Sequence, residues 1–150
     1  MSKYKFILEK QDKNARSGTI KTSLGEIKTP AFMPVATQGA IKSTPINIIE
    51  EIGYEMILSN TYHNILRPGL KIIREFTNLS KFMDWNKPIL TDSGGFQVMS
   101  LSKLRKITKK GVIFQSHIDG SSHELTPENV VETQNIICLL YTSDAADDRM

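Results

Sequence analysis

The sequence contains a single cysteine, Cys138, so it can form no internal disulfide and no zinc site built from several thiolates. It also lacks an apolar run long enough to span a bilayer, and its opening residues lack the apolar core of a signal peptide. Neither glycine-rich phosphate-binding pattern, G-x-G-x-x-G or G-x-x-x-x-G-K-[ST], occurs, which argues against a nucleotide-binding α/β domain. We therefore expect a soluble, unprocessed, cytoplasmic protein with no membrane partner and no metal site on this chain.

What the sequence does contain is the composition of an ordinary globular domain. Of its 150 residues, 39% are hydrophobic and 23% are charged, and we find no internal repeat or low-complexity linker. The 19 lysines and arginines exceed the 16 acidic residues, which gives a formal net charge of +3. This charge permits a polyanionic partner without requiring one.

The N-terminal part of the sequence favours extended structure. Two alternating segments, 18–22 and 26–29, flank a turn that contains Gly25 and predict a β-hairpin. The apolar run 31–36 predicts a strand with a local irregularity, because Pro34 has no amide hydrogen to donate.

Helices and strands then alternate along the chain. Thr44 as N-cap, Pro45 at the first helical position, isoleucines at every third residue and a closing Gly53 predict a short helix. The following segments are predicted by their apolar patterns and turn signals: strands at 55–59 and 88–91, helices at 70–76 and 79–85, a hairpin pairing 103–108 with 111–116, and a helix running from 126 to 137.

This order of strand, helix and strand predicts a parallel sheet. Three parallel strands do not distinguish a doubly wound sheet from a (βα)8 barrel. A closed barrel typically needs about 250 residues, so this chain can supply only the first part of one.

The segment 92–97 is the most informative for chemistry. Asp92 stands where an apolar strand ends in a Gly-Gly loop, which is the end at which parallel α/β folds bind their ligands. Its carboxylate can accept hydrogen bonds from the N–H groups of a flat base, glycine amides can approach the ring, and Phe96 can stack on it. The alternative is that Asp92 only organises the turn, and the local sequence leaves both open.

Two other groups of residues invite a functional interpretation. His117, Asp119, His123 and Glu124 are potential metal ligands, although Asp119-Gly120 is an ordinary turn signal and the spacing fits no known zinc motif. Asn60 and His63 follow a strand end and either face a pocket or brace a loop, so neither is assigned a catalytic role.

A basic cluster follows the third predicted parallel strand. This cluster either contacts phosphates of a nucleic acid or forms the solvated rim of a hairpin, and the sequence leaves both open. The cluster consists of Lys103, Arg105, Lys106, Lys109 and Lys110.

Several separate segments resemble signature stretches of the tRNA-guanine transglycosylase family, in the family's order and at similar spacing. The resemblance extends from Phe6 to about Ile137. The segments are 29–35 (TPAFMPV), 59–63 (SNTYH), 66–69 (LRPG), 90–98 (LTDSGGFQV) and 125–128 (LTPE). Ala36, where the family suggests glycine, and Asn64, where it suggests leucine, are the departures near these motifs.

The resemblance implies an incomplete (βα)8 TIM barrel with an N-terminal β-hairpin and about three of its strands. It also implies an enzyme that exchanges guanine for a 7-deazaguanine at the wobble position of tRNA. An aspartate attacks the ribose, guanine leaves, and the incoming base displaces the enzyme. The partners are then the tRNA anticodon loop and the base. By the same resemblance Asp92 is catalytic and recognises the base, Ser93, Gly94 and Gly95 line the base pocket, and Phe96 stacks on the base.

The resemblance also predicts which parts of the family's enzyme this chain lacks. The nucleophilic aspartate and a structural zinc site belong to a later part of the family, so we expect an N-terminal fragment, inactive alone, that needs no cofactor itself. We divide the chain into 1–137, barrel, and 138–150, a tail without family features that looks like aberrant translation. A full-length protein is expected to form a homodimer. A non-catalytic accessory or base-binding fragment is the alternative, and the sequence does not decide between 7-aminomethyl-7-deazaguanine and queuine.

Overall fold

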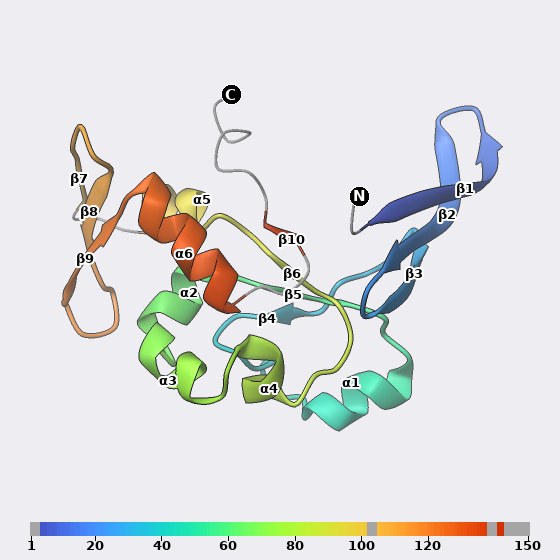
Figure 1. Ribbon diagram of the computed structural model, residues 1–150, viewed down its shortest axis with the longest axis horizontal. Helices are drawn as coiled ribbons and strands as arrows, with labels where there is room; N and C mark the ends of the chain where they lie inside the picture. The colour runs from blue at the N-terminus through green and yellow to red at the C-terminus, as the bar shows by residue number, and fades with distance from the viewer. Residues whose placement is uncertain (1–3, 102–104, 138–140, 143–150) are drawn as a thin grey trace.

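The structure is a computed structural model that describes residues 4–101, 105–137 and 141–142. Three sheets make up its strands: antiparallel β1-β2-β3, parallel β10-β6-β5-β4, and antiparallel β7-β8-β9. Figure 1 shows the two antiparallel sheets at opposite ends of the longest axis, with the parallel strands and most helices between them.

The strands are β1 (Lys5–Asp12), β2 (Ala15–Thr22), β3 (Gly25–Thr29), β4 (Val35–Ala36), β5 (Ile57–Ser59), β6 (Ile89–Thr91), β7 (Arg105–Ile107), β8 (Val112–Gln115), β9 (Ser122–Leu125) and β10 (Tyr141–Thr142). The helices are α1 (Ile46–Ile52), α2 (Thr61–Leu66), α3 (Leu70–Glu75), α4 (Leu79–Met83), α5 (Gly95–Leu101) and α6 (Pro127–Ile137). Within the described ranges none of these helices has the length and hydrophobicity needed to cross a membrane.

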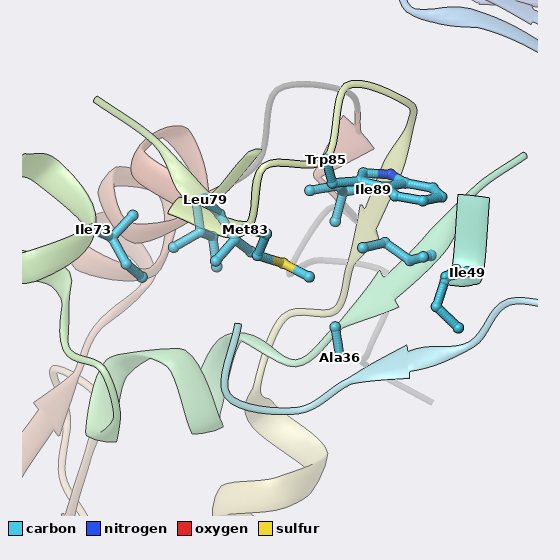
Figure 2. Packing of buried hydrophobic residues seen from close by; sticks show 9 residues of the cluster. Ala36, Ile49, Ile73, Leu79, Met83, Trp85 and Ile89 are labelled. Atoms are coloured by element: carbon cyan, nitrogen blue, oxygen red, sulfur yellow. The ribbon is translucent and has the colours of Figure 1, made fainter. Parts of the chain in front are cut away.

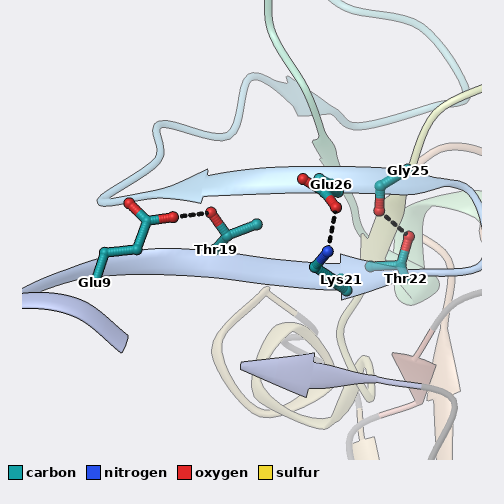
Figure 3. A network of polar contacts seen from close by, with 6 residues as sticks. All are labelled: Glu9, Thr19, Lys21, Thr22, Gly25 and Glu26. Carbon is teal, nitrogen blue, oxygen red and sulfur yellow. Dashed lines mark hydrogen bonds and ion pairs between the residues drawn. The ribbon is translucent and has the colours of Figure 1, made fainter. Parts of the chain in front are cut away.

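The N-terminal sheet confirms the predicted hairpin as β2 and β3, and adds β1, which the sequence pattern did not reveal. Most residues of β1 are exposed, so no buried face marks it as a strand. Polar side chains connect the strands across the sheet (Figure 3). Lys21 Nζ lies 2.8 Å from Glu26 Oε1, and Thr19 Oγ1 donates to Glu9 Oε1 at 2.6 Å.

The central sheet confirms the prediction of parallel strands, since β4, β5 and β6 pair in parallel. The expected strand at 31–36 is shorter than predicted and forms only at Val35–Ala36. Pro34 cannot donate to the ladder, but its carbonyl accepts from the Leu58 amide at 3.0 Å and so starts the pairing.

Two residues of the segment that the sequence sets apart as a tail belong to this sheet. Tyr141–Thr142 form β10, which pairs in parallel with β6 on the side opposite β5. Residues 138–140 and 143–150 lie outside the described part of the chain. The molecule is thus a mixed α/β structure whose four parallel strands run in chain order across the sheet.

Helices α3, α4 and α6 confirm the predictions for their segments, whereas α1 begins one residue later than expected. Its N-cap is Pro45, not Thr44, and no side chain caps it, while Gly53 ends it at φ 93°. Only Ile49 of its isoleucines is buried, and Ile52 is 62% exposed, so the predicted apolar stripe is wrong at its C-terminal turn. Helices α2 and α5 were not predicted.

The main core lies between the parallel sheet and the helices that cover it (Figure 2). Ile57 and Ile89, paired across β5 and β6, contribute to it together with the indole of Trp85, whose Nε1 donates to the Pro88 carbonyl at 3.1 Å. Helix α6 packs against α2, α3 and α4. This packing fixes the carboxyl ends of β5 and β6, where the candidate site lies.

Candidate active site

The candidate site is formed where the neighbouring parallel strands β5 and β6 end. Asp92 directly follows β6, and Asn60 directly follows β5. Ser59 and Thr91, the last residues of the two strands, are paired in register and buried. The two polar side chains therefore emerge side by side at the edge where parallel folds place ligand-binding groups.

The Asp92 carboxylate accepts hydrogen bonds from three donors. Asn60 Nδ2 donates to Oδ2 at 2.7 Å, and Gln97 Nε2 donates to the same oxygen at 2.8 Å. The backbone amide of Thr61 donates to Oδ1 at 2.8 Å. We call these residues, Asp92, Asn60, Thr61 and Gln97, the Asp92 clamp; it fixes both carboxylate oxygens while Asp92 remains half-buried.

The backbone beside the carboxylate is held as well. Thr61 Oγ1 donates to the Asp92 carbonyl, which also accepts from Gln134 Nε2 at 3.3 Å. Gln134 lies on α6 and is 1% exposed, so this contact connects the strand end to the helix that covers it. A carbonyl with two lone pairs is satisfied by these two donors.

Sequence reasoning placed Asp92 correctly at a strand end but missed its partners. For Asn60 the sequence leaves a pocket-facing and a loop-bracing position both open, and it gives Thr61, Gln97 and Gln134 no role. The position of Asn60 at the end of the adjacent strand was the available signal, because carboxyl ends of parallel strands converge. No sequence signal indicated the contact of Gln134, since this residue follows Asp92 by more than forty positions.

The predicted pocket residues occupy distinct environments around the start of α5. Ser93 is 9% exposed, and its Oγ accepts from the Gly95 amide at 3.4 Å. Gly94 adopts φ +78°, and a Cβ on it would lie 3.1 Å from the Tyr62 amide nitrogen. Gly94 thus permits the turn to approach α2. The Phe96 side chain is 76% exposed on the first turn of α5.

A buried polar chain supports the clamp from below. Asn64 Nδ2 donates to Ser59 Oγ at 2.8 Å and to the Asn60 carbonyl at 2.9 Å, and Ser59 Oγ donates to the Ala36 carbonyl at 2.7 Å. Asn64, Ser59 and Ala36 are all fully buried. Positions 36 and 64 are therefore joined through one serine hydroxyl.

Aromatic and histidine side chains connect α2 with the sheet β7-β8-β9. Tyr62 is fully buried; its hydroxyl lies 3.1 Å from His117 Nδ1, and its ring packs against Phe114 at 5.3 Å between centroids. Burial raises the pKa of Tyr62. Burial also lowers the pKa of His63, an effect to which nearby His117 adds and which the Asp92 carboxylate opposes.

Three of the four potential metal ligands near residue 120, His117, Asp119 and His123, make other contacts. His117 contacts Tyr62, and His123 Nε2 lies 2.8 Å from Ser121 Oγ. Ser121 Oγ also donates to Asp119 Oδ1 at 2.7 Å, and hydrogen bonds from Ser121 and Ser116 lower the pKa of Asp119 to about 2. Among the described residues no group of three or more His, Cys, Asp and Glu side chains is arranged to hold a metal ion.

Comparison with known proteins identifies the family. The family described as queuine tRNA-ribosyltransferase matches residues 11–138. A queuine tRNA-ribosyltransferase of Rickettsia felis is 54% identical over 137 residues, covering 91% of this chain and 38% of the relative. Relatives of the same name from Rickettsia prowazekii and Thermoanaerobacter pseudethanolicus are 54% and 56% identical, with 38% and 36% of their lengths covered.

The chain therefore spans less than two fifths of the length of these curated relatives. Within that span the similarity includes β5, β6 and the whole Asp92 clamp. A match over most of the chain, together with more than half of the aligned residues identical, shows that the chain belongs to the queuine tRNA-ribosyltransferase family.

Proposed function

We propose that this chain carries the base-recognition part of a tRNA-guanine transglycosylase, which exchanges guanine for a 7-deazaguanine at the tRNA wobble position. The Asp92 clamp is the observation that supports this proposal most strongly. It holds a carboxylate at the ligand-binding end of a parallel sheet, with each oxygen fixed by named donors. The family membership supplies the reaction class.

Asp92 is proposed to bind the edge of the base and to exchange a proton with it. A carboxylate offers about four lone-pair sites, and the clamp occupies three of them, so acceptor capacity remains for a ring or exocyclic N–H. The donors from Asn60 and Gln97 share one oxygen and both come from side chains, so they can rotate away when a base N–H replaces them. The Thr61 donor is a backbone amide, which cannot rotate away, so it keeps the carboxylate in place while the base binds.

The proposed reaction has two displacements. In the first, an aspartate from the part of the enzyme beyond this chain forms a bond to the ribose C1′ as the bond to guanine N9 breaks. In the second, the incoming base forms its bond to C1′ and the enzyme carboxylate leaves. The departing guanine takes up one proton, which Asp92 can donate when it is protonated, and the incoming base then returns one proton to the Asp92 carboxylate, so Asp92 ends in the state in which it began.

The remaining pocket residues act on the plane of the base. Phe96 presents most of its ring to solvent at the start of α5, as a stacking platform for a flipped-out base requires. Base–aromatic stacking contributes about 1–3 kcal/mol per base. Ser93 and Gly94 are buried and Gly95 is exposed, all directly before Phe96 in the chain, and we assign all of them to the pocket lining.

The parallel strands are proposed to belong to a (βα)8 barrel. Strands β4, β5, β6 and β10 follow one another across the sheet in chain order, as barrel strands do, whereas a doubly wound sheet reverses its order at a switch point. A homodimer and a cytoplasmic location are further proposals for the whole protein. The described residues do not fit the family's structural zinc, because their histidines and carboxylates form no ligand group, and no step above involves it.

The experiment uses the chain fused to the C-terminal remainder of the Rickettsia felis relative, which we call the completed protein. Incorporation of labelled guanine into tRNA is measured for the wild type, Asp92→Asn and the control Asp12→Asn on exposed β1. We expect Asp92→Asn to lower the rate about 100-fold or more, the range of general acid–base catalysis, and Asp12→Asn to leave it unchanged. Circular dichroism confirms that each variant is folded.

Three results would contradict the proposal. A folded Asp92→Asn protein with the wild-type rate would remove Asp92 from the chemistry. Exchange by the 150-residue chain alone would show that the attacking carboxylate lies within it, whereas absence of exchange in both the chain and the completed protein would favour the alternative of a non-catalytic base-binding protein.

A further inference from the structure

The sheet β7-β8-β9 carries a concentration of exposed positive charge. Arg105 and Lys106 lie on β7, and Lys109 and Lys110 lie at its turn into β8; we call these residues the basic turn. All of them are exposed. Lys103, which the sequence groups with them, lies outside the described residues.

The turn that presents the two lysines is held by its own hydrogen bonds. Thr108 Oγ1 accepts from the amides of Lys110 and Gly111 at 3.2 and 3.1 Å, and the Thr108 amide donates to the Gly111 carbonyl at 2.8 Å. Gly111 approaches β9 so closely that a Cβ would lie 2.0 Å from the Leu125 carbonyl oxygen. A backbone fixed in this way loses little conformational entropy when the lysines bind a partner.

The basic turn is attached to the helix that carries Phe96. The Arg105 guanidinium donates to the Met99 carbonyl on α5. Phe96 and Met99 are three residues apart on α5, on the same side of that helix, and their side chains are 76% and 47% exposed. An exposed surface therefore runs from the Phe96 ring along α5 to the cationic strand β7.

The same sheet is also anchored to the Asp92 clamp. Phe114 on β8 is buried against Tyr62, the residue that follows clamp residue Thr61 in α2. Tyr62 in turn contacts His117 just beyond β8. The position of the basic turn relative to the candidate base site is thus set by buried contacts rather than by an exposed loop.

We propose that the basic turn binds backbone phosphates of the RNA whose base enters the Asp92 site. This inference rests on the proposed function, because an RNA strand that delivers a base to Asp92 continues with phosphates on either side of it. Exposed lysines beside such a site gain affinity by releasing counterions from the RNA. The N-terminal sheet is also lysine-rich, but it lies at the other end of the molecule (Figure 1).

The test measures binding of a fluorescein-labelled anticodon stem-loop RNA to the 150-residue chain by anisotropy over a series of salt concentrations. The variant is Lys109→Gln with Lys110→Gln. The matched control, Lys5→Gln with Lys10→Gln on β1, removes the same charge from the opposite end. The logarithm of the binding constant falls linearly with the logarithm of the salt concentration, and loss of two phosphate contacts makes this negative slope shallower by about 1.4 for single-stranded RNA. We expect this change in the variant and none in the control.

A parallel series with Asp92→Ala, and with RNA that is abasic at the wobble position, separates this inference from the proposed function. An unchanged slope in the lysine variant, with binding still dependent on Asp92 and the base, would overturn the phosphate contact alone. A reduced slope with no dependence on Asp92 or the base would support the contact and overturn the proposed function. Equal slope changes in variant and control, or no RNA binding by the wild type, would overturn the basic turn as a specific surface.

Discussion

Replacing Asn64 by leucine should stabilise the protein, although it removes two hydrogen bonds. Asn64 is fully buried, and its Nδ2 donates to Ser59 Oγ and to the Asn60 carbonyl. Its Oδ1 is buried without a partner among the described residues. Both acceptors keep another bond in the variant, since Ser59 Oγ donates to Ala36 and the Asn60 carbonyl accepts from the backbone amide of residue 64 at 3.1 Å.

The direction of the change in the free energy of unfolding follows from comparing three contributions. Loss of the two hydrogen bonds costs about 1 kcal/mol each, roughly 2 kcal/mol together. Removal of the unpartnered oxygen ends a desolvation penalty of about 1–3 kcal/mol, which offsets that loss. Leucine has the same number of side-chain heavy atoms as asparagine, with the same branching, and adds apolar burial of about 1–2 kcal/mol. The free energy of unfolding should therefore rise by about 1 kcal/mol.

The assay is urea unfolding followed by circular dichroism, with Asn64→Ala and Asn64→Asp as comparison variants. Alanine should destabilise because it leaves a cavity, and aspartate should destabilise further because it buries a charge without donors. A midpoint for Asn64→Leu lower than that of the wild type, at equal slope, would refute the reasoning. It would mean that the amide oxygen has a partner, such as an ordered water, in solution.

Three further predictions concern the site and its surroundings. Burial lowers the pKa of His63, so the contribution of this residue to stability should be present above about pH 6.5 and lost as the pH falls through the lowered pKa. The variant His63→Gln should therefore show a smaller fall in urea midpoint between about pH 7 and 5 than the wild type. An equally steep fall in the variant would contradict this. Ser121→Ala should raise the pKa of Asp119 from about 2 toward 3.8, measured by carboxyl chemical shifts in NMR, and an unchanged titration would exclude the hydrogen bond as its cause. Gly94→Ala should destabilise by about 1 kcal/mol or more in thermal unfolding, because alanine at φ +78° is strained and its Cβ crowds α2, whereas a neutral effect would show that the turn can relax.

The order of elements could be read from the sequence because each carries a local signal. Buried strands β5 and β6 appear as apolar runs, and α6 begins at the capping pair Thr126-Pro127, where the Asn129 amide donates to Thr126 Oγ1 at 3.3 Å. Helices α2 and α5 have no such signal. Each is short, and α5 begins at a glycine that local propensity assigns to a loop.

The candidate site was predictable only in part for a related reason. Asp92 could be found because its own neighbours mark a strand end. Its contacts with Asn60 and Gln134 depend on β5 and α6 packing beside β6, which is a property of the tertiary structure. The pattern of residues along one segment contains no information about these partners, so the clamp emerged only from the fold.

The central claim is that the Asp92 carboxylate reads the N–H edge of the base. Its most direct test is equilibrium binding of guanine and of hypoxanthine, which lacks the exocyclic amino group, to the completed protein and its Asp92→Ala variant. A hydrogen bond to a charged acceptor contributes about 1.5–3 kcal/mol, so the wild type should prefer guanine by about tenfold or more. The variant should bind both bases with similar affinity; a folded variant that retained the full preference for guanine would contradict the account.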